Sequence, residues 1–190
     1  MGRWEPDARG RLERAALALY AERGFDQTTV EDIAVRAGLT KRTFFRHYAD
    51  KRDVLFAGAG VLQELVVRAV DSAPPTSTAI GAVIVGLEAA AGLLRERREE
   101  ASARQVVIDA NPELQERELV KLSTLAQGIA GALRGRGIAA RTATLTSEAG
   151  IAVFRVAFNR WIAEAGPQDL VPLIHETLDE LRAAASDDFC

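Results

Sequence analysis

Apolar residues near the N-terminus recur at every third or fourth position, which is the spacing of one face of a helix. The pattern predicts a first helix over residues 7–23, and Gly24 ends it because glycine readily adopts the left-handed backbone of a closing turn. A second helix begins at Thr28 or Thr29, since each threonine is followed three positions later by an acid, as in a capping box. This helix is short and ends at Gly38.

Only Gly38 and Leu39 separate the second helix from a third, which is expected from Lys41 to Tyr48. Two short helices that are joined by a tight glycine-containing turn, and packed on a longer helix, are typical of a helix-turn-helix domain. The pattern therefore predicts such a three-helix domain over residues 1–50.

The rest of the chain, residues 51–190, keeps the helical spacing in longer segments. A fourth helix is expected from Lys51 to about Val70, followed by a loop over residues 71–78. Further helices are expected at residues 77–98, 99–110, 112–134, 142–165 and 168–185, with breaks at Asn111-Pro112, Gly135–Gly137 and Gly166-Pro167. The sequence thus predicts an all-α protein of about nine helices with a second, helical domain over residues 51–190.

The charge is distributed unevenly along the chain, although the net charge of −3 is small. Residues 1–53 hold 11 Lys and Arg against 9 Asp and Glu, whereas the other 137 residues hold 13 against 18. The sign of this asymmetry indicates a polyanion-facing N-terminal part on an acidic body.

The sequence offers little catalytic or metal-binding chemistry. The only cysteine is Cys190, and the two histidines, His47 and His175, fall in different predicted helices without metal-ligand spacing. We therefore expect no disulfide, no metal, no cofactor and no enzyme. The longest apolar stretch, residues 79–94, contains Glu88 and three glycines and is too short and too interrupted to span a bilayer. Since the first residues also lack the apolar run of a signal peptide, a cytoplasmic location is expected.

The third helix carries the most informative chemistry. Its cationic and polar side chains lie off the apolar stripe that Phe44 and Tyr48 form; they are Lys41, Arg42, Thr43, Arg46 and His47. A short helix of this kind fits the major groove of DNA, where arginine and lysine bind guanine O6 and N7 or phosphates. The alternative interpretation is an ordinary exposed helix with cationic residues.

The segment from Leu12 to Leu55 resembles the DNA-binding domain of the tetracycline-repressor (TetR) family of bacterial regulators. The resemblance rests on four motifs: Ala15-Ala16…Leu19-Tyr20…Arg23-Gly24-Phe25, Thr28-Thr29-Val30-Glu31-Asp32-Ile33-Ala34, Ala37-Gly38-Leu39-Thr40, and Thr43-Phe44-Phe45-Arg46-His47-Tyr48 leading to Lys51. It covers about a quarter of the chain. It implies that residues 1–50 bind DNA and that residues 51–190 form a regulatory and dimerisation domain.

The resemblance also implies roles for single residues. Thr28 and Thr29 are expected at a phosphate, residues 41–43 at base edges, and His47 and Lys51 at the DNA backbone. Position 45 is commonly a tyrosine in the family, whose hydroxyl reaches a phosphate, whereas here it is Phe45. Phe45 therefore packs against sugars or a thymine methyl, or only fills space, and Arg46 is the candidate to compensate.

A two-fold dimer is expected by likeness to the family, because one domain makes too few contacts for specific binding and two recognition helices about 34–36 Å apart meet successive major grooves. The last two helices are expected to form the interface through apolar stripes at Leu145, Ala149, Val153, Val156, Leu170, Ile174, Leu178 and Leu181. Alternatively, these stripes face the core of their own chain.

An effector cavity is expected, again by likeness to the family, inside the second domain. Its candidate walls and polar anchors are Phe56, Leu62, Val66, Leu87, Arg104, Val107, Leu122, Phe158, Asn159 and Trp161. The few aromatic residues and many small aliphatic ones suit a hydrophobic ligand.

Together these features favour a homodimeric transcriptional repressor that binds palindromic operator DNA and is released when a small effector shifts the fourth helix. One alternative is a DNA-binding regulator without small-molecule input, controlled by its abundance or by a protein partner. Another is a helical enzyme or scavenger with an incidental basic head, which the absence of a catalytic constellation disfavours.

Overall fold

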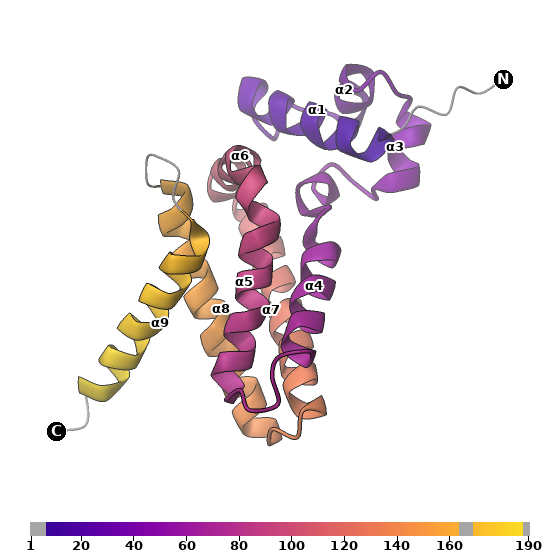
Figure 1. Cartoon of the computed structure of the whole chain (residues 1–190). Helices are drawn as coiled ribbons and strands as arrows, with labels where there is room; N and C mark the ends of the chain where they lie inside the picture. Colours follow the sequence, from indigo (N-terminus) through magenta and orange to yellow (C-terminus); the bar gives the residue numbers. More distant parts are fainter. Residues whose placement is uncertain (1–6, 164–168, 188–190) are drawn as a thin grey trace. The chain divides into compact units, whose positions relative to one another are not determined.

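The computed structural model describes residues 7–163 and 169–187, and in this part of the chain every regular element is a helix (Figure 1). The described residues form nine α-helices and two short 3₁₀ helices. The predicted all-α class is therefore confirmed. The expected break at Gly166-Pro167 and the cysteine at position 190 lie outside the described residues.

The chain forms two compact units that do not follow the sequence order. Residues 1–59 and 102–118 form one unit, here called the head unit, and residues 60–101 and 119–190 form the other, the body unit. The domain boundary expected at residue 50 stays a prediction. The head unit nevertheless includes seventeen residues from the second half of the chain, and these are important for the site.

The head unit contains α1 (Ala8–Arg23), α2 (Val30–Arg36), α3 (Lys41–His47) and the 3₁₀ helix η1 (Asp53–Phe56). Each short helix begins at a threonine: the side chain of Thr29 accepts the Asp32 N–H, and that of Thr40 accepts the Thr43 N–H, both at 3.1 Å. In the turn between α2 and α3 Gly38 has a φ of 66°, a conformation that favours glycine. The core of the head unit is apolar and includes Leu12, Ala16, Leu19, Tyr20, Phe25, Ile33, Ala34, Phe44, Tyr48, Phe56, Ile108 and Leu114.

The expected fourth helix from Lys51 to Val70 is wrong in its first part. The chain makes η1, and α4 begins only at Ala59 and runs to Asp71. The carboxylate of Asp50 caps the start of this segment, since its Oδ1 accepts the N–H groups of Arg52 at 2.8 Å and Asp53 at 3.0 Å. The interruption lies between η1 and α4, where the glycines at 58 and 60 lower the helix propensity.

The other helices are α5 (Ala79–Leu94), α6 (Arg98–Asp109), α7 (Pro112–Gly135), α8 (Ala140–Ala163) and α9 (Leu170–Asp187), with the 3₁₀ helix η2 at Arg95–Arg97. In the body unit α5, α8 and α9 pack against one another (Figure 1). The packing between α5 and α8 is close, because a Cβ added at Gly150 would clash with Val83 Cγ1. Trp161 is buried in the same core.

Candidate nucleic-acid interface

The outer face of α3 brings together six of the nine residues that were predicted to bind DNA. Lys41, Arg42, Phe45, Arg46 and His47 are exposed and Thr43 is half-buried, whereas Phe44 and Tyr48 on the inner face are buried. A hollow of about 590 Å³ on this face is lined by Arg42, Thr43, Phe45 and Arg46. The helix therefore presents cationic, hydroxyl and aromatic groups together on one surface.

The charges on this face are available to a ligand. Arg42 and Arg46 form no ion pair with any described residue, and Lys41 only reaches Glu31 at 4.0 Å across an exposed contact. Phe45 is 50% exposed and its ring lies edge-on to that of the buried Phe44, with centroids 5.6 Å apart. The buried ring therefore fixes the position of an aromatic side chain that solvent reaches.

Thr28 and Thr29 have different environments in the structure, although the sequence suggested the same role for both. The Thr29 hydroxyl is exposed and caps α2, where it donates to Asp32 Oδ2 at 2.6 Å. Hydrogen bonds from Thr29 hold the pKa of Asp32 below its usual value. Thr28 is buried, and its hydroxyl donates to the carbonyl of Gly24 at 2.8 Å. This geometry does not support a phosphate contact by the Thr28 hydroxyl, which is turned inward, and the predicted role of Thr28 stays a prediction.

The ammonium group of Lys51 is also bound within the protein. Its Nζ donates to the carbonyl oxygens of Phe25, Asp26 and Thr28 at 2.8, 3.3 and 3.1 Å, and it lies 4.2 Å from the centroid of the Phe25 ring. An ammonium group has three donors, and all three are directed at the loop between α1 and α2. The predicted grip of Lys51 on the DNA backbone is not supported by this geometry.

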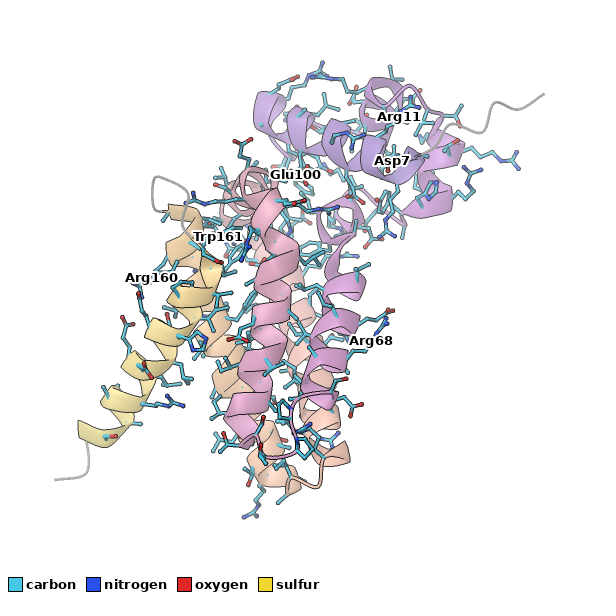
Figure 2. All side chains as sticks on the ribbon, in the orientation of Figure 1. Asp7, Arg11, Arg68, Glu100, Arg160 and Trp161 are labelled. Atoms are coloured by element: carbon cyan, nitrogen blue, oxygen red, sulfur yellow. The ribbon has the colours of Figure 1, made fainter. Side chains whose placement is uncertain are left out.

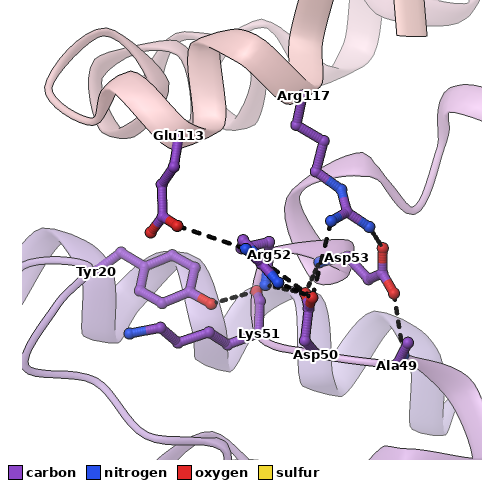
Figure 3. A network of polar contacts seen from close by, with 8 residues as sticks. All are labelled: Tyr20, Ala49, Asp50, Lys51, Arg52, Asp53, Glu113 and Arg117. Atoms are coloured by element: carbon purple, nitrogen blue, oxygen red, sulfur yellow. Dashed lines mark hydrogen bonds and ion pairs between the residues drawn. The ribbon is translucent and has the colours of Figure 1, made fainter. Parts of the chain in front are cut away.

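A network of charged side chains that sequence reasoning missed lies directly after α3 (Figure 3). Arg117 contacts Asp53 through a hydrogen-bonded ion pair and lies 3.7 Å from Asp50, while Arg52 reaches Glu113 at 3.5 Å. Partial burial raises the pKa of Asp50, but hydrogen bonds from Arg52 and from the backbone, with the charge of Arg117, outweigh it and lower that pKa overall. No periodicity reveals such pairs, because their members are about sixty positions apart.

The residues expected to line an effector cavity do not share one core. Phe56 and Val107 belong to the core of the head unit, and the Arg104 guanidinium there donates to the Leu55 carbonyl. The others lie in the body unit: Val66, Leu87 and Trp161 are buried in its core, Leu62, Leu122 and Phe158 pack against it, and Asn159 is exposed. The ten residues therefore divide between the two units, with Phe56, Arg104 and Val107 in the head unit, and the effector cavity stays a prediction.

The predicted dimer residues also divide into two groups. Val153, Leu170, Ile174 and Leu178 are buried in the core of the body unit, so they have no surface left for a partner. Leu145, Val156 and Leu181 are 74%, 47% and 40% exposed, and Ala149 is half-buried. The stripes thus face their own core along one side, and the apolar residues on the other side remain exposed.

Two matches to known families cover most of the chain. Residues 13–57 match the bacterial regulatory proteins of the tetR family, and residues 75–186 match the MftR C-terminal domain. The second match alone spans more than half of the chain. The chain belongs to the TetR family. The TetR-family resemblance predicted from α1 to α3 is thereby confirmed, and so is the expectation that the protein is a transcriptional regulator rather than an enzyme.

Individual proteins resemble this TetR-family regulator over part of its sequence or over most of its fold. It is 33% identical over 88 residues to the HTH-type transcriptional regulator TcmR of Streptomyces glaucescens, a match that covers 46% of this chain and 39% of TcmR. Among solved structures, the SmeT–triclosan complex superposes with a TM-score of 0.66 at 19% identity, covering 93% of this chain and 90% of that one. Thermus thermophilus FadR in complex with lauroyl-CoA has a TM-score of 0.55 at 24% identity, covering 92% and 93%. These structures share the fold.

Two further observations concern metal binding and membrane crossing by the described residues. They contain no group of three or more His, Cys, Asp or Glu side chains that could hold a metal ion. Within the same ranges, no helix has the length and apolar character that crossing a membrane requires.

Proposed function

We propose that this TetR-family regulator is a homodimeric repressor that binds a palindromic operator through α3 and is released by a small hydrophobic effector. The observation that carries the proposal is the outer face of α3, where Arg42 and Arg46 are exposed without acidic partners beside Phe45. A short helix can insert into the major groove of DNA and contact base edges when its outer face is cationic and a buried aromatic stripe holds its inner face.

The proposed roles follow from position along α3. Lys41, Arg42 and Thr43 occupy its first turn, where recognition helices contact base edges. Arg46 and His47 in the last turn, and Thr29 at the start of α2, are proposed to contact the DNA backbone. Phe45 packs against a sugar or a thymine methyl, because a phenyl ring has no hydroxyl for a phosphate.

The exposed apolar residues of α8 and α9 support the proposed dimer. Leu145, Val156 and Leu181 remain exposed while the opposite sides of their helices are buried. Large apolar side chains that remain exposed beside a buried core side are often found at interfaces. We therefore propose that α8 and α9 pair with the same helices of a second copy.

Two relatives by fold are solved with ligands that carry apolar groups: triclosan for SmeT, and lauroyl-CoA, a charged thioester with an apolar acyl chain, for FadR. They support a hydrophobic effector for the body unit. The filled core around Leu87 and Trp161 favours the second candidate function, a regulator without small-molecule input. A thermal-shift screen of acyl-CoA thioesters and apolar drugs separates the two, since only an effector-binding body is stabilised by a ligand.

The experiment that tests the DNA-binding proposal is selection of bound duplexes from a random DNA pool at fixed salt, because phosphate contacts make affinity strongly salt-dependent. The wild type is expected to enrich a palindrome, and Arg42→Ala is expected to relax the base preference within each half-site. Arg68→Ala is the matched control, since Arg68 is an exposed arginine of α4 that extends away from that helix and pairs only with Glu64 (Figure 2). Failure of the wild type to enrich any motif would overturn the proposal.

A further inference from the structure

The segment that follows the recognition helix, residues 49–57, is fixed on one side by α1. Tyr20 Oη donates to the Lys51 carbonyl at 2.6 Å, Arg9 donates to the Ala57 carbonyl, and Tyr48 Oη donates to Glu13 at 2.9 Å. These bonds lie within the part of the chain that matches the TetR-family DNA-binding region or flank it. They attach this segment to α1, while the core of the head unit also contains Ile108 and Leu114 from residues 102–118.

The other side of the same segment is held by residues 102–118. Arg117 donates to Asp53 Oδ1, and the second oxygen of that carboxylate accepts the Ala49 N–H at 3.0 Å (Figure 3). Ala49 comes immediately after Tyr48, the C-cap of α3. One carboxylate therefore bridges the end of the recognition helix to α7.

Arg104 makes a second connection to the same segment, at Leu55 and Phe56. Its Nε donates to the Leu55 carbonyl at 2.7 Å, and its guanidinium carbon lies 5.0 Å from the centroid of the Phe56 ring. The Arg117 guanidinium carbon lies 6.0 Å from the same centroid, so two guanidinium groups contact one buried ring. Glu118 holds Arg104 in place through a 3.2 Å ion pair.

Two features show that this network does more than stabilise the head. Arg117 Nε is buried and lacks a hydrogen-bond partner among the described residues, which costs stability rather than adding to it. Moreover, residues 102–118 lie inside the match to the MftR C-terminal domain and outside the match to the DNA-binding region. The part of the sequence that matches the C-terminal domain thus supplies the arginines that contact residues 50–56, the segment that follows α3.

We propose that Arg117 and Arg104 are positioning residues for operator binding, which set the orientation of α3 through Asp53 and Phe56. The inference rests on the proposed function and adds to it the residues by which the regulatory part of the chain controls the reading helix. A change in the α6–α7 region that separates Arg117 from Asp53 frees the Ala49 N–H and the end of α3. Operator affinity then falls although no DNA-contacting residue has changed.

The test compares four variants on the duplex recovered from the random pool and on a scrambled duplex of equal length. Arg117→Met keeps the side-chain length without the charge, Arg117→Lys keeps the charge with fewer donors, and Asp53→Asn is combined with Arg117→Met as a double variant. Arg68→Met is the matched control because its ion pair with Glu64 is exposed. Amide hydrogen exchange at Ala49 reports the bridge directly, and unfolding curves confirm that each variant is folded at the assay temperature.

We expect Arg117→Met to weaken operator binding on the order of tenfold while binding to the scrambled duplex changes little. Arg117→Lys restores part of the loss, the double variant binds no more weakly than Arg117→Met alone, and exchange at Ala49 accelerates in Arg117→Met. Unchanged operator affinity with wild-type exchange at Ala49 would overturn the proposal. Equal losses on both duplexes would also overturn it, since they indicate general destabilisation.

These outcomes are distinguishable from a failure of the proposed function. If the wild type enriches no operator, the repressor proposal fails, whereas Ala49 exchange in the Arg117 variants still decides whether this arginine fixes the end of α3. Protection of Ala49 that is independent of Arg117 overturns the positioning role in either case.

Discussion

At the scale of single residues, Lys51 shows how a cation in a DNA-binding head can be committed entirely to the protein. All three of its donors go to the carbonyls of Phe25, Asp26 and Thr28. These carbonyls precede α2, so the lysine fixes the path of the loop that leads into it. A phosphate would have to compete with three internal acceptors for the same ammonium group.

We therefore predict that Lys51→Met affects stability rather than the electrostatics of DNA binding. Removing a charged donor from several carbonyls is expected to lower the free energy of unfolding by about 1.5–3 kcal/mol, measured by urea denaturation. The slope of log Kd against log salt stays at its wild-type value, whereas Arg46→Met reduces it by about one. An equal reduction in both variants would show that Lys51 contacts a phosphate.

Asp50 gives the second residue-scale prediction, which concerns pH. Its pKa is raised by partial burial but lowered overall by Arg52, by the Asp53 backbone and by the charge of Arg117. Because the folded-state pKa lies below the ordinary value of 3.8, the ionised carboxylate stabilises the fold at neutral pH. This contribution is lost as the pH falls below 3.8 and through the folded-state pKa.

The difference in free energy of unfolding between the wild type and Asp50→Asn is therefore expected to be constant above about pH 5 and to shrink in more acidic solution. Urea denaturation at several pH values measures it. A difference that grows on acidification would mean that the carboxyl group is protonated more readily in the folded head than in the unfolded chain, so that folding raises the pKa of Asp50 instead of lowering it.

At the scale of elements, the recognition helix depends on its N-cap. α3 has only seven residues, and the Thr40 hydroxyl accepts the Thr43 N–H at 3.1 Å and lies 3.0 Å from the Thr43 hydroxyl. Thr40→Ala is expected to lower the free energy of unfolding by about 1 kcal/mol and to weaken operator binding by fraying the turn that contacts bases. Thr40→Ser retains the hydroxyl and serves as the control; denaturation and operator titration of both variants provide the measurement.

The threonine caps show which helix boundaries can be predicted from the sequence. Thr29 and Thr40 identify the starts of α2 and α3 because capping is a local interaction between a side chain and a backbone N–H three residues on. The predicted start of α4 is wrong because apolar spacing continues through residues 51–57, whereas the chain forms η1 there and α4 begins only at Ala59. The contacts of Arg104 and Arg117 with residues 50–55 are not predictable from spacing, since they join positions that are 49 to 67 residues apart.

The burial of the candidate site residues could likewise be predicted for α3 but not for α8. Spacing identified the outer face of α3 because Phe44 and Tyr48 mark its inner face. Spacing alone does not show which side of α8 faces the core, because Val153 and Val156 are both apolar. Only the packed structure separates them: Val153 is buried among α5 and α9, and Val156 is exposed.

At the scale of the whole molecule, specific binding requires two heads held at a fixed separation. One seven-residue helix contacts few base pairs, whereas two helices about 34–36 Å apart contact both half-sites of a palindrome on one face of the duplex. Leu145 and Val156 are exposed apolar side chains of α8, the helix that we propose to join two copies. Dimerisation and operator affinity are therefore expected to fail together.

We predict that Leu145→Glu and Val156→Glu each convert the dimer to a monomer at micromolar concentration, because a carboxylate buried in an apolar interface has no partner to offset its desolvation. Sedimentation velocity measures the mass, and titration of full and half operators measures the consequence. Affinity for the full palindrome is expected to fall at least tenfold, on the order expected for loss of a central interface residue, while affinity for an isolated half-site stays unchanged. Val61→Glu is the matched control, since Val61 is 59% exposed on α4. If both α8 variants sediment as dimers, this face is not the interface; if they are monomers with full affinity for the palindrome, a single head suffices for recognition.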